Sequence, residues 1–95
     1  MGLRFEWDER KAFLNQTKHG VSFDEATTVF IDPLADIFDD EAHSIEEERE
    51  IIIGHSFSNR LLLVCFTERG ETTRIISARK VTRDERQKYE ENILR

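Results

Sequence analysis

The sequence predicts an α+β fold, in which a twisted antiparallel β-sheet has two helices before it and one after it. Apolar runs suited to β-strands fall in the second half of the chain, at 48–56, 60–69 and 72–79. The tetrapeptides SFDE (22–25) and TRDE (82–85) both have the Ser/Thr-x-x-Glu spacing of a helix N-terminus. Short polar turns separate these segments, so we expect the helices to pack mainly on one face of the sheet.

The chain opens with a strand and a helix. LRFEW (3–7) alternates apolar and charged residues, which predicts a half-buried strand. Asp8 is a suitable N-cap for a helix that stops at Gly20. Ala12 and Phe13 should lie on the inner face of this helix.

A second helix is predicted to begin at Ser22 and to end at Asp32-Pro33, because the residue before a proline disfavours helix. LADIF (34–38) is assigned as a short strand. The polar, acidic segment 39–50 is expected to form a loop that leads into the sheet.

The second half of the chain predicts a meander of three strands. A hairpin through 57–59 joins the first two apolar runs, and Gly70 marks the turn into the third. Both apolar runs of the hairpin are continuous, so both of their faces should be covered. The last helix is expected to run from Thr82 to about Leu94.

Composition narrows the function classes. With 95 residues and 38% hydrophobic residues, we expect a single domain over residues 1–95. Cys65 is the only cysteine, which excludes an internal disulfide. The sequence has no apolar run near the ~20 residues that cross a bilayer, so we expect a soluble cytoplasmic protein without membrane contact.

Charge is distributed unevenly along the chain. The net charge is −6, yet residues 72–95 hold seven Lys/Arg and four Asp/Glu, a balance of +3. The remaining residues hold seven basic and sixteen acidic residues, a balance of −9. Such a chain can bind a polyanion at one end and a basic partner at the other.

The boxes KHGVSF (18–23) and RIISARKVTRDERQKYE (74–90) carry a resemblance that covers nearly the whole chain. They resemble the BrnT toxins of type II toxin–antitoxin systems. The resemblance implies a RelE-like fold and a metal-independent endoribonuclease, without cofactor, that cleaves RNA and inhibits translation. This chain differs from the family pattern at Phe66, a position where members of the family often have histidine.

The resemblance also implies a set of partners. These are a BrnA-like ribbon-helix-helix antitoxin, an RNA substrate, and operator DNA bound only through the antitoxin complex. A heterotetramer with the antitoxin is expected.

Metal-free RNA cleavage needs a base for the 2′-hydroxyl, positive charge for the phosphoryl oxygens and an acid for the leaving oxygen. Histidine can exchange protons at cellular pH, and guanidinium groups match phosphate geometry. The catalytic candidates are His19, Arg74, Arg79 and Glu68. The RNA-binding candidates are Lys18, Arg60, Arg69, Lys80 and Arg83.

The same residues could instead have purely structural roles. Arg74 could form a cross-strand ion pair with Glu68 or Glu71, and Arg79 could be held by the last helix. On an ideal strand the two arginines would point to opposite faces, so they could meet only if the strand twists or bulges. His19 could simply favour the carboxyl end of its helix.

Other residues are assigned less specific roles. Tyr89 and Trp7 are expected to pack in the interior. The cluster from Asp39 to His43 lacks the spacing of a calcium loop and is expected to be a solvated loop, not a metal site. The acidic segment Asp32–Glu50 could meet a basic segment of an antitoxin.

Two functions of different classes remain open at this stage. The first is the RNA-cleaving toxin. The second is a non-catalytic antitoxin-binding module that forms part of an autorepressor complex. Direct DNA recognition is disfavoured, because the chain is acidic overall and has no helix-turn-helix pattern.

Overall fold

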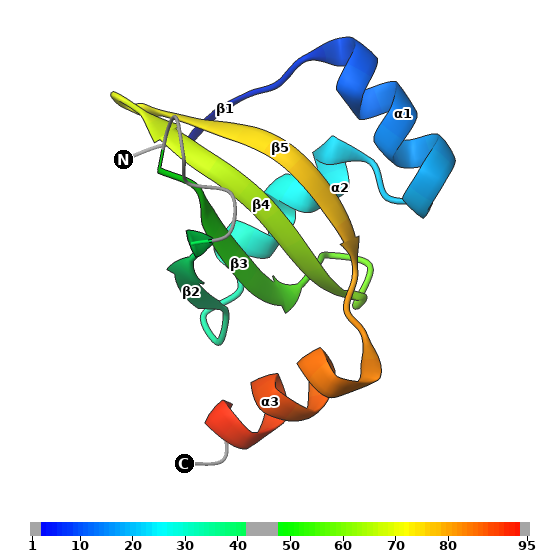
Figure 1. Ribbon diagram of the computed structural model, residues 1–95, viewed down its shortest axis with the longest axis vertical. Helices are drawn as coiled ribbons and strands as arrows, with labels where there is room; N and C mark the ends of the chain where they lie inside the picture. Colours follow the sequence, from blue (N-terminus) through cyan, green and yellow to red (C-terminus); the bar gives the residue numbers. More distant parts are fainter. Residues whose placement is uncertain (1–2, 42–47, 94–95) are drawn as a thin grey trace.

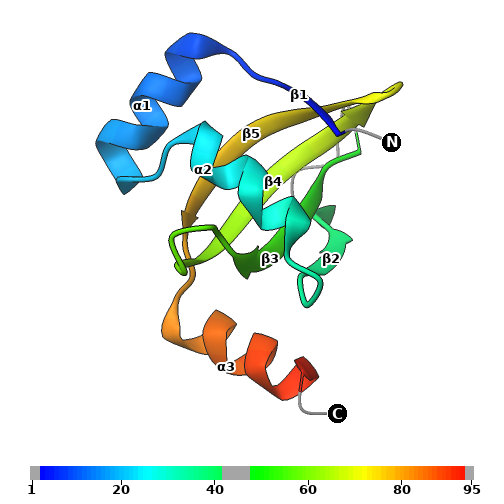
Figure 2. The ribbon, with the colours of Figure 1, turned by 180° about the vertical axis from the view of Figure 1, so that it is seen from behind.

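Five strands form one sheet in the order β1-β5-β4-β3-β2. The structure, a computed structural model, describes residues 3–41 and 48–93. Figures 1 and 2 show α1 and α2 against one side of the sheet and α3 beyond one end of its strands. The elements are β1 (Arg4–Glu6), α1 (Glu9–His19), α2 (Phe23–Thr28), the 3-10 helix η1 (Val29–Ile31), β2 (Asp36–Asp39), β3 (Glu50–His55), β4 (Leu61–Arg69), β5 (Thr72–Lys80) and α3 (Arg83–Ile93).

The predicted α+β class and the predicted order of elements are confirmed. β2 begins two residues later than expected and ends one residue later. The predicted helix end at Leu94, residues 42–47 of the acidic loop and His43 lie outside the described residues.

The sheet differs from the prediction in one pairing. β2–β3, β3–β4 and β4–β5 are antiparallel, but β1 pairs with β5 in parallel, with Phe5 opposite Thr73. The sheet is therefore mixed. Alternation along β1 shows that it is a strand, but the direction of pairing depends on the path of the chain through all the intervening elements.

The main core lies between the sheet and the helices α1 and α2. Fully buried side chains come from both layers: Val21, Phe23, Ala26, Val29, Ile52, Leu62, Val64, Phe66, Ile75 and Ala78. Phe30 packs between Phe5 and Phe66, with ring centroids 5.1 and 5.0 Å away. Trp7, predicted to pack in the interior, is partly buried and meets Phe23 of the core edge-on at 5.9 Å.

A smaller apolar cluster lies on the opposite face of the sheet, where α3 packs. Ile53, Leu61 and Leu63 contact Tyr89, the buried residue of α3. The expectation that the helices pack mainly on one face is therefore wrong for α3. The physical reason lies in the continuous apolar runs of β3 and β4, which give the sheet a second face to cover.

Side-chain caps fix the ends of the helices. Asp8 accepts hydrogen bonds from the N–H groups of Arg10 and Lys11 at 2.8 and 3.1 Å, and Gly20 ends α1 with φ 69°. Phe13, predicted to face inward, is 70% exposed. The inner face of α1 is instead marked by the buried amide of Asn15.

Asn15 makes three hydrogen bonds, two of which join α1 to the sheet. Its Nδ2 donates to the carbonyl oxygens of Val21 and Ala78 at 3.0 and 2.8 Å, and its Oδ1 accepts from the N–H of Ala78 at 3.1 Å. These bonds hold the last turns of α1 beside the last residues of β5.

A bulge interrupts β5. Cys65 pairs with Ser77 and Phe66 pairs with Ile75, so Ile76 has no partner on β4. Ile75 and Ala78 both face the main core although they are three residues apart. The bulge therefore shifts the alternation of the strand by one residue.

Gly54 allows a close approach between β3 and the chain that leads into β2. A Cβ atom at this position would lie 2.8 Å from the Cβ of Ala35 and 3.0 Å from an oxygen of Asp32. The segment 32–35 can therefore rest directly on β3 only because position 54 has no side chain.

We predict that Asn15→Ala lowers the free energy of unfolding by about 2–4 kcal/mol, because it leaves buried N–H and C=O groups of Ala78 and Val21 unpaired. Urea denaturation would measure the loss. Gln16→Ala, at an exposed neighbouring position, should change the stability by less than about 0.5 kcal/mol. Equal effects of both substitutions would contradict this account of Asn15.

Candidate functional site

Several predicted site residues meet at one end of the sheet, where α1 ends, β4 begins, β5 ends and α3 begins. We call this region the basic end and define it by Lys18, His19, Arg60, Arg79, Lys80 and Arg83. Two contacts hold its parts together: Asn15 binds Ala78, and Arg60 Nη2 donates to the carbonyl oxygen of Gly20 at 3.0 Å. Figures 1 and 2 show the end of α1 beside the end of β5.

Exposure distinguishes the members of the basic end. Lys18, Lys80 and Arg83 are exposed, whereas His19 is partly buried. The charge of Lys80 contributes to lowering the pKa of Glu25, which places its ammonium group near that carboxylate. The exposed cations are thus available to an anionic ligand beside a partly buried imidazole.

Arg60 is held by Glu25, a carboxylate that is only 8% exposed. The Nε of Arg60 donates to Glu25 Oε2 at 2.9 Å, and its Nη2 forms a second bond to Oε1. Ser56 Oγ also donates to Oε2, at 2.6 Å. These bonds to Arg60 and Ser56 outweigh burial and hold the pKa of Glu25 below its usual value.

Arg79 is held by Glu85 of α3 in a bidentate pair. Nη1 and Nη2 donate to the two carboxylate oxygens at 2.8 and 2.9 Å. Glu85 also accepts from the N–H of Thr82 at 2.8 Å, while Thr82 Oγ1 accepts from the N–H of Glu85 at 3.2 Å. The predicted capping box is complete, and Arg79 lowers the pKa of Glu85 to about 2.

The remaining candidates lie toward the other end of the sheet. Arg74 pairs with Glu6 of β1. Glu68 accepts from the hydroxyl of Thr73 at 3.0 Å, and Arg69 is exposed at the end of β4. Eight residue steps of β4 separate Arg69 from Leu61, roughly 25 Å of extended chain. The structure therefore does not place Glu68, Arg69 and Arg74 with the basic end.

The bulge in β5 puts Arg74 and Arg79 on the same face of the sheet. Ile75 faces the main core, so Arg74 points to the opposite face, where Ser77 and Arg79 also lie. Their guanidinium groups are nevertheless held by different carboxylates, Glu6 and Glu85. In the structure they do not form a joint phosphate site.

Phe66, the departure from the family pattern, is a core residue. It is 2% exposed and packs edge-on against Phe30. In this chain the position does not reach the surface, so any proton transfer must use other residues.

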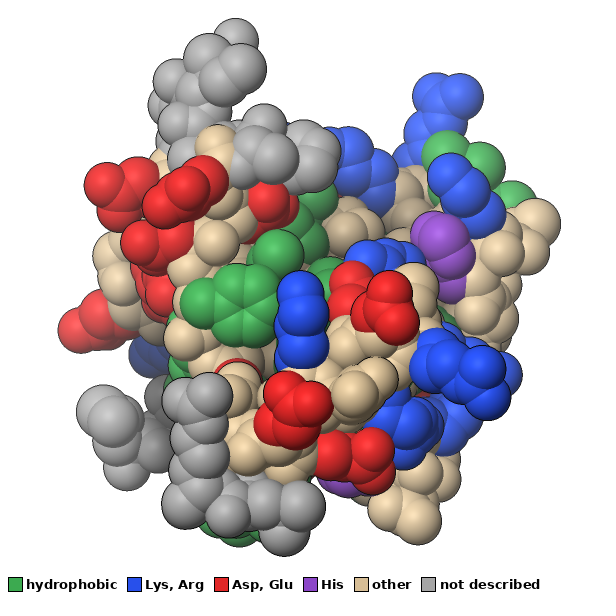
Figure 3. Space-filling view, turned by 60° about the horizontal axis from the view of Figure 1, so that its bottom comes forward, with side chains coloured by type: hydrophobic (Ala, Val, Ile, Leu, Met, Phe, Trp, Pro, Cys, Tyr) green, Lys and Arg blue, Asp and Glu red, His purple; other side chains and the backbone are tan. Residues whose placement is uncertain are grey.

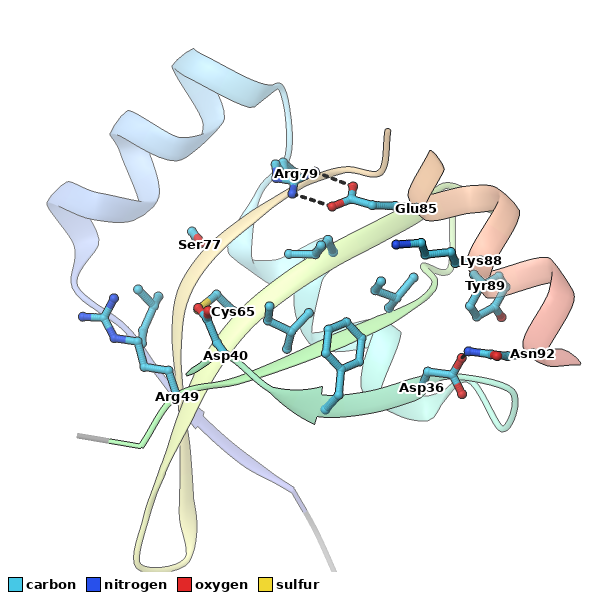
Figure 4. Close-up of a pocket in the computed structure, with 15 residues that line it drawn as sticks. Asp36, Asp40, Arg49, Cys65, Ser77, Arg79, Glu85, Lys88, Tyr89 and Asn92 are labelled. Carbon is cyan, nitrogen blue, oxygen red and sulfur yellow. Dashed lines mark hydrogen bonds and ion pairs between the residues drawn. The ribbon is translucent and has the colours of Figure 1, made fainter. Parts of the chain in front are cut away.

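A groove of about 480 Å³ runs across the face of the sheet that carries α3. Side chains from β2 to β5 form its floor, and α3 forms one wall (Figure 4). Cys65 lies on the floor of the groove. Burial raises the pKa of its thiol to about 11, and the nearby Asp40 contributes to this rise. The thiol therefore stays protonated at neutral pH.

Figure 3 shows acidic side chains gathered on one side of the molecule and basic side chains toward the other.

Within the described ranges, no group of three or more His, Cys, Asp or Glu could hold a metal ion. No helix of the described part of the chain is long and apolar enough to cross a membrane.

Sequence analysis missed the role of Glu25, whereas the structural alternative for Arg79, that the last helix holds it, is confirmed by its pair with Glu85. Both glutamates occupy the last position of a Ser/Thr-x-x-Glu box, so the sequence placed them at helix N-termini. Each of them also binds an arginine: Glu85 binds Arg79 at the end of β5, and Glu25 binds Arg60, just before β4. The sequence gives no signal for the pair of Glu25 with Arg60, because nothing in the box indicates which distant part of the chain the start of α2 will meet.

The basic end has the groups needed for acid–base chemistry on an anion. The imidazole of His19 lies on the same helix end as a lysine, and further cations come from β5 and α3. Such an arrangement suits a phosphodiester, whose charge rises during cleavage.

Comparisons with known proteins point to a family and to a fold. The sequence model of a family described as "Ribonuclease toxin, BrnT, of type II toxin-antitoxin system" matches residues 7–85. The crystal structure of the Brucella abortus ribonuclease toxin BrnT has the same fold, with a TM-score of 0.66 and 24% identity, covering 86% of this chain and 100% of that chain. The comparison with curated proteins gave no match.

We predict that Glu85→Gln flattens the acid limb of the stability profile. The pKa of Glu85 is about 2 in the folded protein against an ordinary value of 4.5, so its contribution is present above pH 4.5 and is lost as the pH falls toward 2. The free energy of unfolding, measured by urea denaturation between these pH values, should fall less steeply in the variant.

Glu90→Gln, at an exposed position on the same helix, is the matched control and should keep the wild-type slope. Because Glu25 also titrates below its usual range, the difference between wild type and Glu85→Gln isolates the contribution of Glu85, which comes from its bonds to Arg79 and Thr82. An unchanged slope in Glu85→Gln would show that these bonds contribute no pH-dependent stability.

Proposed function

Because the chain belongs to the BrnT family of ribonuclease toxins of type II toxin–antitoxin systems, we propose that it cleaves RNA at the basic end and thereby inhibits translation. One observation supports the location: α1, β5 and α3 bring a histidine and several cations from separate parts of the chain to the same end of the sheet. The proposal concerns a metal-independent endoribonuclease.

In this proposal His19 carries the protons. Its imidazole takes the proton of the 2′-hydroxyl as that oxygen attacks the phosphorus. A protonated group then gives a proton to the leaving 5′-oxygen. The products are a 2′,3′-cyclic phosphate and a free 5′-hydroxyl. Cleavage is confined to RNA, because DNA lacks the attacking hydroxyl.

The cations of the basic end bind the phosphate. Lys18, Lys80 and Arg83 are exposed and can approach the phosphoryl oxygens directly. Arg79 can share its guanidinium between Glu85 and the phosphate, since its side chain remains 37% exposed. Together these groups stabilise the charge that develops on the phosphoryl oxygens.

Arg60 is assigned a different task. Glu25 and the carbonyl oxygen of Gly20 already use its guanidinium. We propose that it holds the end of α1, and with it His19, in place beside β5. Arg69 and Arg74 are proposed to contact more distant nucleotides, and Glu68, bonded to Thr73, is too far from the basic end to act on the same phosphate.

The proposed partner is a BrnA-like ribbon-helix-helix antitoxin, forming a heterotetramer that binds operator DNA through the antitoxin. Type II systems pair a protein toxin with a protein antitoxin, and this chain matches a family of that type. The acidic half of the chain offers a surface of opposite sign to a basic partner segment.

A second candidate is a non-catalytic module that binds the antitoxin and shapes a repressor. The observation that favours it is the pairing of Arg60, Arg74 and Arg79, each with its own carboxylate. A site whose arginines serve only structure would have these contacts too.

We predict that the purified chain, free of antitoxin, cleaves RNA in the presence of EDTA, and that His19→Ala lowers the rate about 10²–10⁴-fold through loss of general acid–base catalysis. Gel assays of a defined RNA would give the rate, and end-group analysis should find cyclic phosphate. His55→Gln, on β3, is the matched control and should keep the wild-type rate. Intact RNA at high protein concentration would contradict the proposed activity, and an active His19→Ala would contradict the assignment of the base.

Arg79→Ala separates the two candidate functions. If the chain is an enzyme, growth arrest in cells should be lost and antitoxin binding should persist. The substitution removes a positive charge that stabilises the transition state, so the cleavage rate should fall about 10²-fold or more. Lys11→Ala, an exposed cation on α1, controls for the loss of one charge. Unchanged arrest in both Arg79→Ala and Arg74→Ala would favour the non-catalytic module.

A further inference from the structure

On the α3 side of the sheet, the described residues leave a groove with an apolar floor. Its floor is formed by Ile51, Leu63, Cys65 and Ile76, side chains of the kind that fill the core on the opposite face. α3 contacts this face through Tyr89 and covers the groove only at one end (Figure 4). Of these floor residues, Leu63 and Cys65 are buried, and Ile51 and Ile76 are partly exposed.

The edge of the sheet beside the groove is also open. β2 is the last strand in the sheet order, and the aromatic ring of Phe38 lines the groove while remaining 46% exposed. Ile37, its neighbour, points to the other side of the strand and is 56% exposed. An exposed strand edge beside an apolar floor is typical of a surface that accepts another protein segment.

The rim of the groove along β2 is acidic. Asp36 and Asp40 line the groove on this side; elsewhere its lining includes Glu85 and the three cations Arg49, Arg79 and Lys88.

This acidic rim rules against two of the occupants that could use the groove. RNA that lay along β2 would bring its phosphates toward Asp36 and Asp40, which repel them. A second copy of the chain, paired through β2 in antiparallel register, would place Asp36 opposite Asp39 of the other copy, and like charges directly opposite are destabilising.

We propose that the groove and the β2 edge are the docking surface for a segment of the antitoxin that combines apolar side chains with lysine or arginine. This inference rests on the proposed function, which supplies the protein partner. Apolar side chains of the segment fill the floor beside Phe38, and its cations meet Asp36 and Asp40 along the rim. The occupant lies on the face of the sheet that carries Arg79, so bound partner and bound RNA share one wall of the molecule.

The test compares two neighbouring residues on one strand. The probe is the ribbon-helix-helix protein encoded by the adjacent reading frame, purified separately and titrated into the chain by calorimetry. Phe38→Ala should raise the Kd at least about tenfold, because it removes an aromatic anchor. Ile37→Ala, an apolar truncation on the opposite side of the same strand, should change the Kd less than about twofold.

Charge is tested in the same way. Asp36→Asn should weaken binding and reduce its dependence on salt, whereas Asp24→Asn, at an exposed position on α2, should do neither. Hydrogen exchange supplies a measurement on the unaltered chain: the amides of β2 should exchange more slowly in the complex. Melting temperatures of the variants confirm that each one folds.

The outcomes separate the inference from the proposed function. RNA cleavage is measured on the same preparations without the partner. Equal partner binding by Phe38→Ala and Ile37→Ala, with β2 unprotected in the complex, overturns the docking site and leaves the ribonuclease proposal intact. No binding by the wild-type chain overturns the partner assignment and the docking site with it. A dimer of the wild-type chain that Phe38→Ala dissociates, or a loss of RNA binding in that variant, would assign the groove to another occupant and also overturn the inference.

Discussion

A glutamate at a helix start that binds an arginine from the sheet is the interaction on which this architecture depends. Glu25 at the start of α2 binds Arg60, and Glu85 at the start of α3 binds Arg79. Each carboxylate gains from the positive end of a helix as well as from a guanidinium. Because one pair lies on each face of the sheet, α2 and α3 are both fixed at the same end of the strands, and the basic end is built around them.

The two faces of the sheet differ in how completely they are covered. α1, α2 and η1 close one face with a continuous aromatic and aliphatic core, while α3 meets the other mainly through Tyr89. The bulge at Ile76 adds to this difference, because it turns Ser77 and Arg79 toward the face with the groove. A catalytic end and an open face can therefore coexist in a small domain: they use different parts of the same strands.

Local patterns allowed most of the fold to be predicted. The boxes at Ser22 and Thr82 placed the starts of two helices, and Gly20 and Gly70 placed a helix end and a turn. The parallel pairing of β1, the position of α3 on the second face and the exposure of Phe13 were not predictable in this way. Each depends on how distant segments meet, which neither capping nor alternation encodes.

The same limit applies to the candidate site. Residue type alone identified Lys18, His19, Lys80 and Arg83 as candidates, and the fold brings them to one end. Glu68 and Arg74 were chosen by the same reasoning and lie elsewhere, because position along a strand separates residues that are close in sequence. Arg60 shows a further difficulty: a cation that suits a phosphate also suits a buried carboxylate, and only the tertiary contact with Glu25 reveals which one it serves.

Gly54 has a consequence for how variants of this protein should be interpreted. The hydrogen atom at its Cα is all that separates β3 from Ala35 and Asp32, and the segment that contains those two residues leads directly into β2. Any side chain at position 54 would push this segment outward and carry the edge strand with it. A substitution at a site with no surface of its own could thus reshape the outer margin of the sheet, and a loss of association in such a variant would indicate altered geometry rather than a missing contact.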